Sequence, residues 1–316
     1  MKVIEHLEKA SAPIISFEVI PPKRGGDINQ LFNVVKDVMD YNPPFIDVTS
    51  RAAEVEYRET PQGIQKRIKR KRPGTIGISV AIKNQFHIDT VPHILCHGFT
   101  REETEDALIE LNYLGIENVL AIRGDDLGYE KPLPHYKSQN VYAYELVKQI
   151  DNMNHGKYLE EDLLDASSTN FCIGISGYPE KHFEAPNMAE EIRRVKQKID
   201  SGAHYVVTQL FYDNNKYFDF VKKCRESGIT VPIVPGLKVL TTKSHLTVIP
   251  KNFYVNIPEE LSEEVLAAKP EHVMEIGAKW AAKQSEELLN KGAPSLHFYI
   301  MQSAKPIRKM FEFLNL

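Results

Sequence analysis

Six polar residues stand at or near the ends of short apolar runs, and these side chains are the best placed to do chemistry. They are Glu18, Thr49, Arg123, Asp125, Tyr178 and Gln209. If the apolar runs form the strands of a parallel α/β barrel, residues at their carboxyl ends line the active site. These six residues are therefore the first candidates for catalysis and binding.

Glu18 interrupts the apolar run I-I-S-F-E-V-I-P-P, where a carboxylate must be either desolvated or paired. Desolvation raises the pKa of a carboxyl group toward the range that suits a general acid. The alternative is a capped or salt-bridged carboxylate, with Lys23 or Arg24 as its partner. Position in the sequence leaves both interpretations open.

Arg123, Gly124 and Asp125 directly follow the apolar run N-V-L-A-I. Gly124 would let the backbone turn closely against a ligand, since glycine carries no Cβ. The arginine and the aspartate could also simply neutralise each other at the rim of a site. From the residues alone, mutual neutralisation is the favoured interpretation.

A helix is predicted between Asn187, which with Glu190 resembles a capping box, and Gly202, which can close its far end. Its apolar residues recur at spacings of four, three and four: Met188, Ile192, Val195 and Ile199. A neighbouring charged stripe consists of Glu191, Arg194 and Lys198. Its two cations could hold a phosphate, although a solvated flank with an internal salt bridge is the more common outcome.

Four predicted helices end at a glycine that is followed by a β-branched or aromatic run. The glycines are Gly115, Gly202, Gly228 and Gly292, and the runs are Asn118 to Ile122, His204 to Gln209, Val231 to Pro235 and Ser295 to Ile300. Glycine just past a helix supplies a left-handed cap, and a short loop then leads into a strand. Five earlier runs are also strand candidates: Pro13 to Val19, Phe45 to Thr49, Thr75 to Ala81, His93 to Cys96 and Phe171 to Ile175.

Strands that alternate with helices predict a parallel sheet, and about eight such units close into a barrel. We expect a single (β/α)8 TIM-type barrel domain over residues 1–316, with inserted segments near residues 74–90 and 151–170. Thr75 to Ala81 is the extra strand candidate, because Gly74 to Thr90 is too long for a plain connection and should form a hairpin or edge element. A doubly wound sheet is less favoured, since no glycine-rich phosphate turn follows the first strand.

The composition favours small-molecule partners. With 39 basic and 43 acidic side chains the formal net charge is -4, which gives no reason to expect nucleic acid or an anionic membrane. The N-terminus lacks the apolar core of a signal peptide, and no stretch approaches the ~18 apolar residues of a membrane span, so a cytoplasmic protein is expected. Three cysteines without a C-x-x-C pair indicate buried thiols in a reducing compartment. His93, His97 and His182 lack nearby ligands at reliable spacing, so no metal is expected.

Eight motifs in order resemble the methylenetetrahydrofolate reductase family. They are S-F-E-V-I-P-P-K from Ser16, D-V-T from Asp47, P-H-I-L-C from Pro92, A-I-R-G-D from Ala121, G-Y-P-E-K-H-F-E-A from Gly177, T-Q-L-F-Y-D from Thr208, P-I-V-P-G from Pro232 and L-H-F-Y from Leu296. The resemblance implies a (β/α)8 barrel that holds FAD noncovalently. It also implies reduction of 5,10-methylenetetrahydrofolate to 5-methyltetrahydrofolate with NADH or NADPH in a ping-pong scheme, within one-carbon metabolism and methionine biosynthesis, by a homodimer or homotetramer.

The same resemblance implies roles for individual residues. Glu18 matches the general acid that opens the bridging ring of the folate, and Asp125 matches the residue that favours the cationic iminium beside the flavin. Gln209 matches the glutamine that hydrogen-bonds either substrate, and Ser303 stands where the family has a substrate-binding arginine. Positions that match the FAD lining are Thr49, Ala52, His93, Arg123, Gly124, Asp125, Ala143, Tyr178, His182, Ala185, Glu191, Arg194 and Lys198. Arg194 and Lys198 are implied as partners of its phosphates and ribose.

Three departures from the family pattern affect substrate contacts more than flavin contacts. Ser50 replaces an aromatic residue, Ser303 replaces the arginine, with Lys305 as a possible substitute cation, and Ile249 stands near the place of a substrate-stacking aromatic. They leave room for a flavoprotein that takes electrons from an iron-sulfur partner. A non-catalytic folate- or flavin-binding subunit is the other alternative, which the presence of both Glu18 and Asp125 disfavours.

Overall fold

The computed structural model describes residues 1–70, 72, 74–125, 131, 133 and 136–314. Nine parallel strands form a nearly closed barrel in the order β10-β11-β1-β2-β5-β6-β7-β8-β9. They are β1 (Ile14–Val19), β2 (Phe45–Val48), β5 (Asp89–Leu95), β6 (Asn118–Ile122), β7 (Cys172–Gly177), β8 (Tyr205–Thr208), β9 (Ile233–Val234), β10 (Gly236–Leu237) and β11 (Ser295–Met301). Only Pro235 separates β9 from β10, so these two strands together act as one stave, and the expected eight-stave barrel is confirmed.

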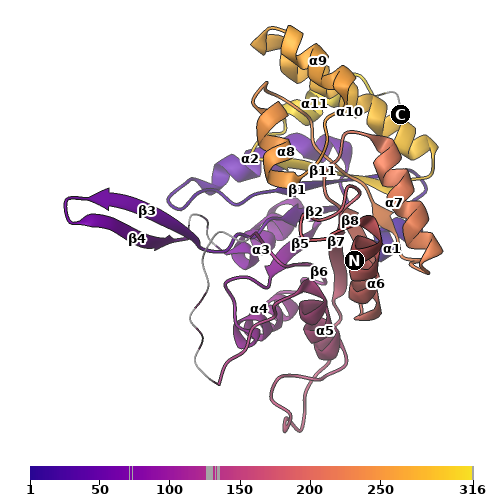
Figure 1. The fold of residues 1–316 in the computed structure, drawn as a ribbon. Helices are drawn as coiled ribbons and strands as arrows, with labels where there is room; N and C mark the ends of the chain where they lie inside the picture. Colours follow the sequence, from indigo (N-terminus) through magenta and orange to yellow (C-terminus); the bar gives the residue numbers. More distant parts are fainter. Residues whose placement is uncertain (71, 73, 126–130, 132, 134–135, 315–316) are drawn as a thin grey trace.

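Helices between the strands cover the outside of the barrel (Figure 1). They are α2 (Ile28–Val38), α3 (Thr75–Phe86), α4 (Arg101–Tyr113), α5 (Ala143–Asn154), α6 (Met188–Asp200), α7 (Asn214–Glu226), α10 (Val273–Asn290) and α11 (Lys305–Phe311). Two further helices, α8 (His245–Phe253) and α9 (Glu259–Ala267), follow β10. The main hydrophobic core lies between strands and helices, where Phe17 and Ile173 belong to the same cluster as Leu108 and Ile192. A second, smaller apolar cluster includes Val3, Val91 and Leu120.

The prediction for Thr75 to Ala81 is wrong, because this segment begins α3. Its β-branched residues favour a strand, yet Thr75, Ile78, Ser79 and Ile82 are buried at helical spacing, and packing overrides local propensity. The predicted hairpin near residues 74–90 is also absent from that place. A hairpin lies upstream instead, formed by β3 (Glu54–Thr60) and β4 (Gly63–Lys69).

The second predicted insertion, near residues 151–170, is correct only in part, because α5 continues to Asn154. The segment after it is an irregular loop that Asn154 ties to the next strand. Asn154 Oδ1 accepts hydrogen bonds from Thr169 Oγ1 at 2.8 Å and from the backbone N–H of Phe171 at 2.7 Å.

The β3–β4 hairpin projects away from the barrel (Figure 1). Its antiparallel register pairs Val55 with Ile68, Tyr57 with Lys66 and Glu59 with Ile64, which places the apolar residues on one face. Tyr57 is 68% exposed and Ile64 is 72% exposed. Because a two-stranded hairpin is only marginally stable in water on its own, we expect this apolar face to pack against another surface.

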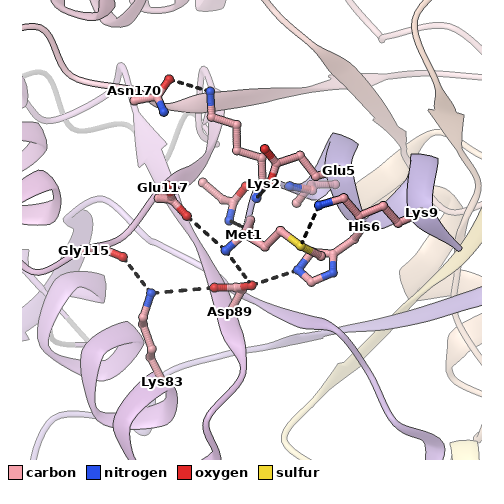
Figure 2. A network of polar contacts seen from close by, with 12 residues as sticks. Met1, Lys2, Glu5, His6, Lys9, Lys83, Asp89, Gly115, Glu117 and Asn170 are labelled. Carbon is pink, nitrogen blue, oxygen red and sulfur yellow. Dashed lines mark hydrogen bonds and ion pairs between the residues drawn. The ribbon is translucent and has the colours of Figure 1, made fainter.

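The amino-terminal end of the barrel is closed by α1 (Val3–Lys9) and a polar network (Figure 2). Asp89 Oδ2 lies 3.0 Å from the amino group of Met1 and 2.8 Å from His6 Nε2, and Val3 is completely buried. Burial would raise the pKa of Asp89, but the hydrogen bonds from His6 and the amino group lower it. With this end closed, a site must open at the carboxyl ends of the strands.

The three cysteines are buried free thiols, as predicted. Burial raises the pKa of Cys96 and of Cys224 to about 12. These cysteines therefore act as small hydrophobic residues, and their thiols stay protonated and unreactive. Within the described part of the chain, no helix is both long and apolar enough to span a membrane.

We expect Gly236→Ala to destabilise the protein by about 2–3 kcal/mol, at the upper end of overpacking costs. A Cβ on Gly236 would lie 2.1 Å from the carbonyl oxygen of Thr208 and 2.7 Å from Tyr299 Oη, both within the closed barrel. The measurement is the free energy of unfolding in denaturant. Gly77→Ala is the matched control: its Cβ meets nothing within 4 Å in a helix, so it should stabilise by about 0.5–1 kcal/mol. Equal effects of the two changes would contradict the prediction.

Candidate active site

A cluster of polar side chains fills the carboxyl-terminal half of the barrel interior. Because successive side chains on a strand face opposite sides, Glu18, Asp47, His93 and His297 point inward from four strands. Glu18 is in register with Asp47 on one side and with Tyr299 on the other. Each of the four is at most 6% exposed. Four segments far apart in the sequence thus bring their ionisable side chains together in one buried cluster.

Glu18 is held by a hydroxyl and two imidazoles. Thr49 Oγ1 donates to Glu18 Oε1 at 2.7 Å, while His93 Nε2 and His297 Nε2 lie 3.6 Å and 3.8 Å from Glu18 Oε2. Burial would raise the pKa of Glu18, but the charge of His93 together with His297 and Thr49 lowers it to about 2. The expectation of a raised pKa is therefore wrong for this resting state.

The predicted alternative partners of Glu18 were Lys23 and Arg24. Among the described residues its ion-pair partners are the two histidines instead, and Arg24 Nε donates to the backbone carbonyl of Arg70 at 3.2 Å. Glu18 is thus paired, as the alternative required, but with groups that can themselves carry a proton.

Asp47 is a site residue to which the sequence-based predictions assign no role. Its side chain is 1% exposed, and neither carboxylate oxygen has a hydrogen-bond partner among the described residues. Asp47 Oδ2 lies 3.6 Å from His93 Nε2, and Oδ1 lies 4.0 Å from His297 Nδ1. Burial would lower the pKa of His93, but Glu18 and Asp47 raise it. One sequence pattern indicated these positions. Asp47 and Thr49 are two residues apart, as are His297 and Tyr299, so the members of each pair face the same side of the sheet.

Tyr299 and Lys238 border this cluster and were also missed. Tyr299 Oη donates to the carbonyl oxygen of Thr208 at 2.6 Å, and Lys238 Nζ donates to the carbonyl oxygen of Tyr299 at 3.3 Å. Burial lowers the pKa of Lys238, and the charge of Glu18 opposes this. The side chain of Lys238 therefore lies close enough to Glu18 for the two groups to interact electrostatically.

At the rim, Arg123 and Asp125 do not neutralise each other as favoured from the residues alone. Arg123 pairs with Glu184 and lies over the ring of Tyr142, 5.5 Å from its centre. Asp125 lies 3.7 Å from Arg51 Nη1, and its side chain is 71% exposed. Gly124 between them has a φ of +88°, which a residue with a Cβ rarely adopts. The turn thus presents a carboxylate to the open end of the barrel.

The loop after β7 places three predicted residues together. The rings of Tyr178 and His182 meet edge to face with 4.8 Å between their centres, and Ala185 is buried. The backbone N–H of His182 donates to Glu191 Oε2 at 3.1 Å, which joins this loop to α6. Burial raises the pKa of Glu191, and Lys198 opposes this.

The charged stripe of α6 is not a solvated flank, because Glu191 is 2% exposed and Lys198 is 8% exposed. Lys198 Nζ donates to the carbonyl oxygen of Ser176, at the end of β7. Burial lowers the pKa of Lys198 despite the opposing charge of Glu191. Arg194 is half-exposed, and its Nε lies 3.1 Å from Glu190 Oε1. The helix thus points one buried and one accessible cation along the same side.

These residues suit an elongated anionic cofactor with a planar ring. Buried polar atoms without a hydrogen-bond partner include Arg123 Nε, His97 Nε2 and His93 Nδ1, all near the carboxyl ends of β5 and β6. Unpaired buried donors cost free energy unless a ligand satisfies them. Lys198 and Arg194 carry the kind of charge that binds phosphate groups, so the chemistry of the donor set is compatible with FAD. In the described part of the chain, no group of three or more His, Cys, Asp or Glu side chains could hold a metal ion.

The remaining predicted residues lie around the opening. Ala52 lines a cleft of about 340 Å³ with Arg51, Arg72 and Met301, and Ala143 is the first residue of α5. Gln209 is half-buried, and its Oε1 accepts from the N–H of Leu210 at 2.9 Å.

The positions that depart from the family pattern have different environments. Ser303 is exposed, and its Oγ accepts from the N–H of Lys305 at 3.3 Å. Ile249 is 2% exposed inside a hydrophobic cluster, so it is a core residue. Exposed aromatic surface lies nearby instead, where Phe183 and Tyr254 stack with 5.0 Å between ring centres. This pair had no role in the sequence-based predictions.

The fold and the site define a (β/α)8 barrel with a buried acid and histidine partners at the carboxyl ends of its strands. Sequence comparison is more specific, because the family model for methylenetetrahydrofolate reductase matches residues 2–315. The chain belongs to the methylenetetrahydrofolate reductase family.

Known relatives differ in how much of them the chain covers. Methylenetetrahydrofolate reductase 1 of Schizosaccharomyces pombe is 30% identical over 304 residues, which are 95% of this chain and 46% of the relative. The 5,10-methylenetetrahydrofolate reductase of Pectobacterium carotovorum is 27% identical over 92% of this chain and 86% of the relative. The chain thus spans about half the length of the eukaryotic relatives it matches.

A solved structure has the same fold. It is an uncharacterized protein from Clostridium thermocellum that binds two copies of 5-methyl-5,6,7,8-tetrahydrofolic acid. The match has a TM-score of 0.56 at 13% identity and covers 98% of this chain and 96% of the other. At this identity the likeness establishes the fold alone.

Proposed function

We propose that residues 1–316 act as one catalytic barrel that reduces 5,10-methylenetetrahydrofolate to 5-methyltetrahydrofolate, with FAD as cofactor and NADH or NADPH as electron donor. Family membership supports the reaction, and the Clostridium thermocellum protein of the same fold binds its product. The observation that carries the proposal is Glu18, a buried carboxylate in contact with imidazole groups at the opening of the barrel. A protein that only bound folate would have no use for such a proton donor.

The proposed cofactor site runs from the opening toward α6. FAD, when bound, takes a hydride from the nicotinamide and delivers it to the folate. Tyr178, His182 and Ala185 would border its ring system, with Gly124 allowing close approach of the backbone. Arg194 and Lys198 would bind its phosphates and ribose. The remaining residues of the proposed lining are Thr49, Ala52, His93, Arg123, Asp125, Ala143 and Glu191.

The chain's own groups would control the proton and the charge. Glu18 would protonate the nitrogen of the bridging ring, so that the ring opens to an electrophilic iminium. The carboxylate of Asp125 would stabilise that cation, and Gln209 would hydrogen-bond whichever substrate is bound. Ser303 cannot supply the positive charge of an arginine, so Lys305 is the proposed substitute. Both are exposed, beside the end of β11.

An anaerobic spectral titration tests this function. The purified protein should be yellow, NADH or NADPH should bleach it, and methylenetetrahydrofolate should restore the oxidised spectrum. A bleached flavin that other acceptors reoxidise but that ignores the folate would refute the substrate. Bleaching by dithionite but by neither nicotinamide would favour the alternative in which an iron-sulfur protein supplies the electrons.

We also propose a homodimer or homotetramer in which the apolar face of the β3–β4 hairpin packs on a second copy. Tyr57→Ser combined with Ile64→Ser should then reduce the mass measured by light scattering, because it removes the apolar contact. Arg58→Ser changes the opposite face of the same hairpin and should leave the mass unchanged. The same mass for all three proteins would exclude the hairpin from the interface.

A further inference from the structure

One imidazole nitrogen in the barrel lies between two carboxylates. His93 Nε2 is 3.6 Å from Glu18 Oε2 and 3.6 Å from Asp47 Oδ2. His93 is 4% exposed and Asp47 is 1% exposed, so the charges interact with little screening by water. Glu18 has the hydroxyl of Thr49 as a hydrogen-bond donor, whereas Asp47 has none among the described residues.

A purely structural role does not account for Asp47. Burying a carboxylate without hydrogen bonds costs free energy, and structural carboxylates normally accept bonds that repay this cost. The neighbouring imidazoles are the groups that can offset it, and they do so only when they carry a proton. The buried charge of Asp47 therefore stabilises the protonated form of its neighbours.

We propose that Asp47 is a positioning residue that keeps His93 protonated, and that His93 supplies the proton which Glu18 passes to the folate. This inference rests on the proposed function, in which Glu18 is the acid. Glu18 is ionised in the resting state, so it needs a proton source before it can donate. His93 is the nearest titratable donor to the free oxygen of Glu18.

The proton transfer is balanced. The N–H bond of His93 Nε2 breaks and an O–H bond forms at Glu18 Oε2, which leaves His93 neutral and the net charge of the three groups unchanged at minus one. That O–H bond then breaks as the proton moves to the ring nitrogen of the folate. The three groups are left at minus two, and His93 regains a proton from water before the next turnover. The imidazole must approach Glu18 by a few tenths of an ångström to reach hydrogen-bond distance.

The other groups that face the cluster do not compete for this proton. Burial raises the pKa of Tyr205 and of Tyr299 well above the ordinary value, so both stay neutral. His297 Nδ1 is engaged by Ser16 Oγ at 2.9 Å, and its Nε2 is 3.8 Å from Glu18. Lys238 Nζ donates to the carbonyl oxygen of Tyr299, on the side of Glu18 that is remote from Asp47 along the strand order.

Asp47→Asn should move the pH dependence of folate reduction. Losing the carboxylate lowers the pKa of His93, and the protonated form is present only below that pKa. The alkaline limb should therefore move about one pH unit or more toward lower pH, which makes the rate at pH 8 about tenfold lower and leaves it near the wild-type value at pH 6. Flavin reduction by the nicotinamide needs no acid and should keep its rate at both pH values. Thr90→Val removes another buried polar group of the barrel, away from the cluster, and should change neither half-reaction.

A titration of the unliganded wild-type protein by NMR, with ¹³C-labelled histidine, tests the same inference without turnover. The His93 signal, assigned by its loss in His93→Gln, should titrate above the ordinary value of about 6.5. In Asp47→Asn it should titrate lower. A neutral His93 at pH 7 in the wild-type protein would overturn the inference, as would an equal rate loss at every pH in the variant. If the wild-type enzyme does not reduce the folate at all, the proposed function fails, while the titration still tests the state of His93.

Discussion

Glu18→Gln should reduce folate turnover by about 10²- to 10⁴-fold, the range over which a positioned general acid acts. Glutamine keeps the size of the side chain and can accept the hydrogen bond from Thr49, which is 2.7 Å in length. It cannot pass a proton to the ring nitrogen, so the iminium would not form at a useful rate. Hydride transfer from the nicotinamide requires no acid, and flavin binding does not depend on this carboxylate.

Stopped-flow spectroscopy separates the two half-reactions. In Glu18→Gln the flavin should still bleach with NADH or NADPH at the wild-type rate, while its reoxidation by methylenetetrahydrofolate becomes very slow. Glu117→Gln, the same change at the closed end of the barrel, should leave both rates intact. Unchanged folate turnover in Glu18→Gln would remove this residue from the mechanism and revive the interpretation as a non-catalytic binding subunit.

The sequence predicts the barrel well because its signals are local. The cap glycines Gly115, Gly202, Gly228 and Gly292 all have positive φ, as expected for the residue after a helix. The prediction of a strand at Thr75 to Ala81 failed for a physical reason. Strand and helix differ there only by which residues are buried, and burial depends on the neighbours in space. The hairpin at Glu54–Thr60 was missed for a different reason, since its mostly charged, exposed strands lack the apolar content expected of a barrel strand.

The candidate site depends on contacts that no local pattern contains. Asp47, His93 and His297 lie on strands from different parts of the chain, and only the strand order β11-β1-β2-β5 brings them around Glu18. The sequence could therefore predict that Glu18 is buried, but not that histidines surround it. This difference reverses the expected direction of its pKa, because burial alone raises the pKa, whereas the charge of His93 and the hydrogen bond of His297 lower it. The family resemblance named His93 as a flavin contact, whereas the structure adds its place between two carboxylates.

Lys198→Met should weaken FAD binding by about 10- to 100-fold, the equivalent of the roughly 1.5–3 kcal/mol of one hydrogen bond to a charged group. Lys198 is 8% exposed, and the surrounding protein already holds its ammonium near the end of β7. A buried cation attracts a phosphate more strongly than an exposed one, because water screens it less. Methionine retains most of the length and apolar volume of the side chain, so the loss should come from the charge.

Flavin content after desalting and the dissociation constant from fluorescence titration measure this effect. Lys196→Met is the matched control, because Lys196 lies on the same helix but is partly exposed and pairs with Asp200. Removing Lys198 alone leaves Glu191 buried without its cation, which could itself destabilise the fold. The double variant Lys198→Met with Glu191→Gln removes both charges, so its apoprotein should unfold at close to the wild-type denaturant concentration while FAD binding remains weak. Wild-type affinity in that double variant would show that the phosphates of FAD lie elsewhere, and that the buried pair on α6 only stabilises the barrel.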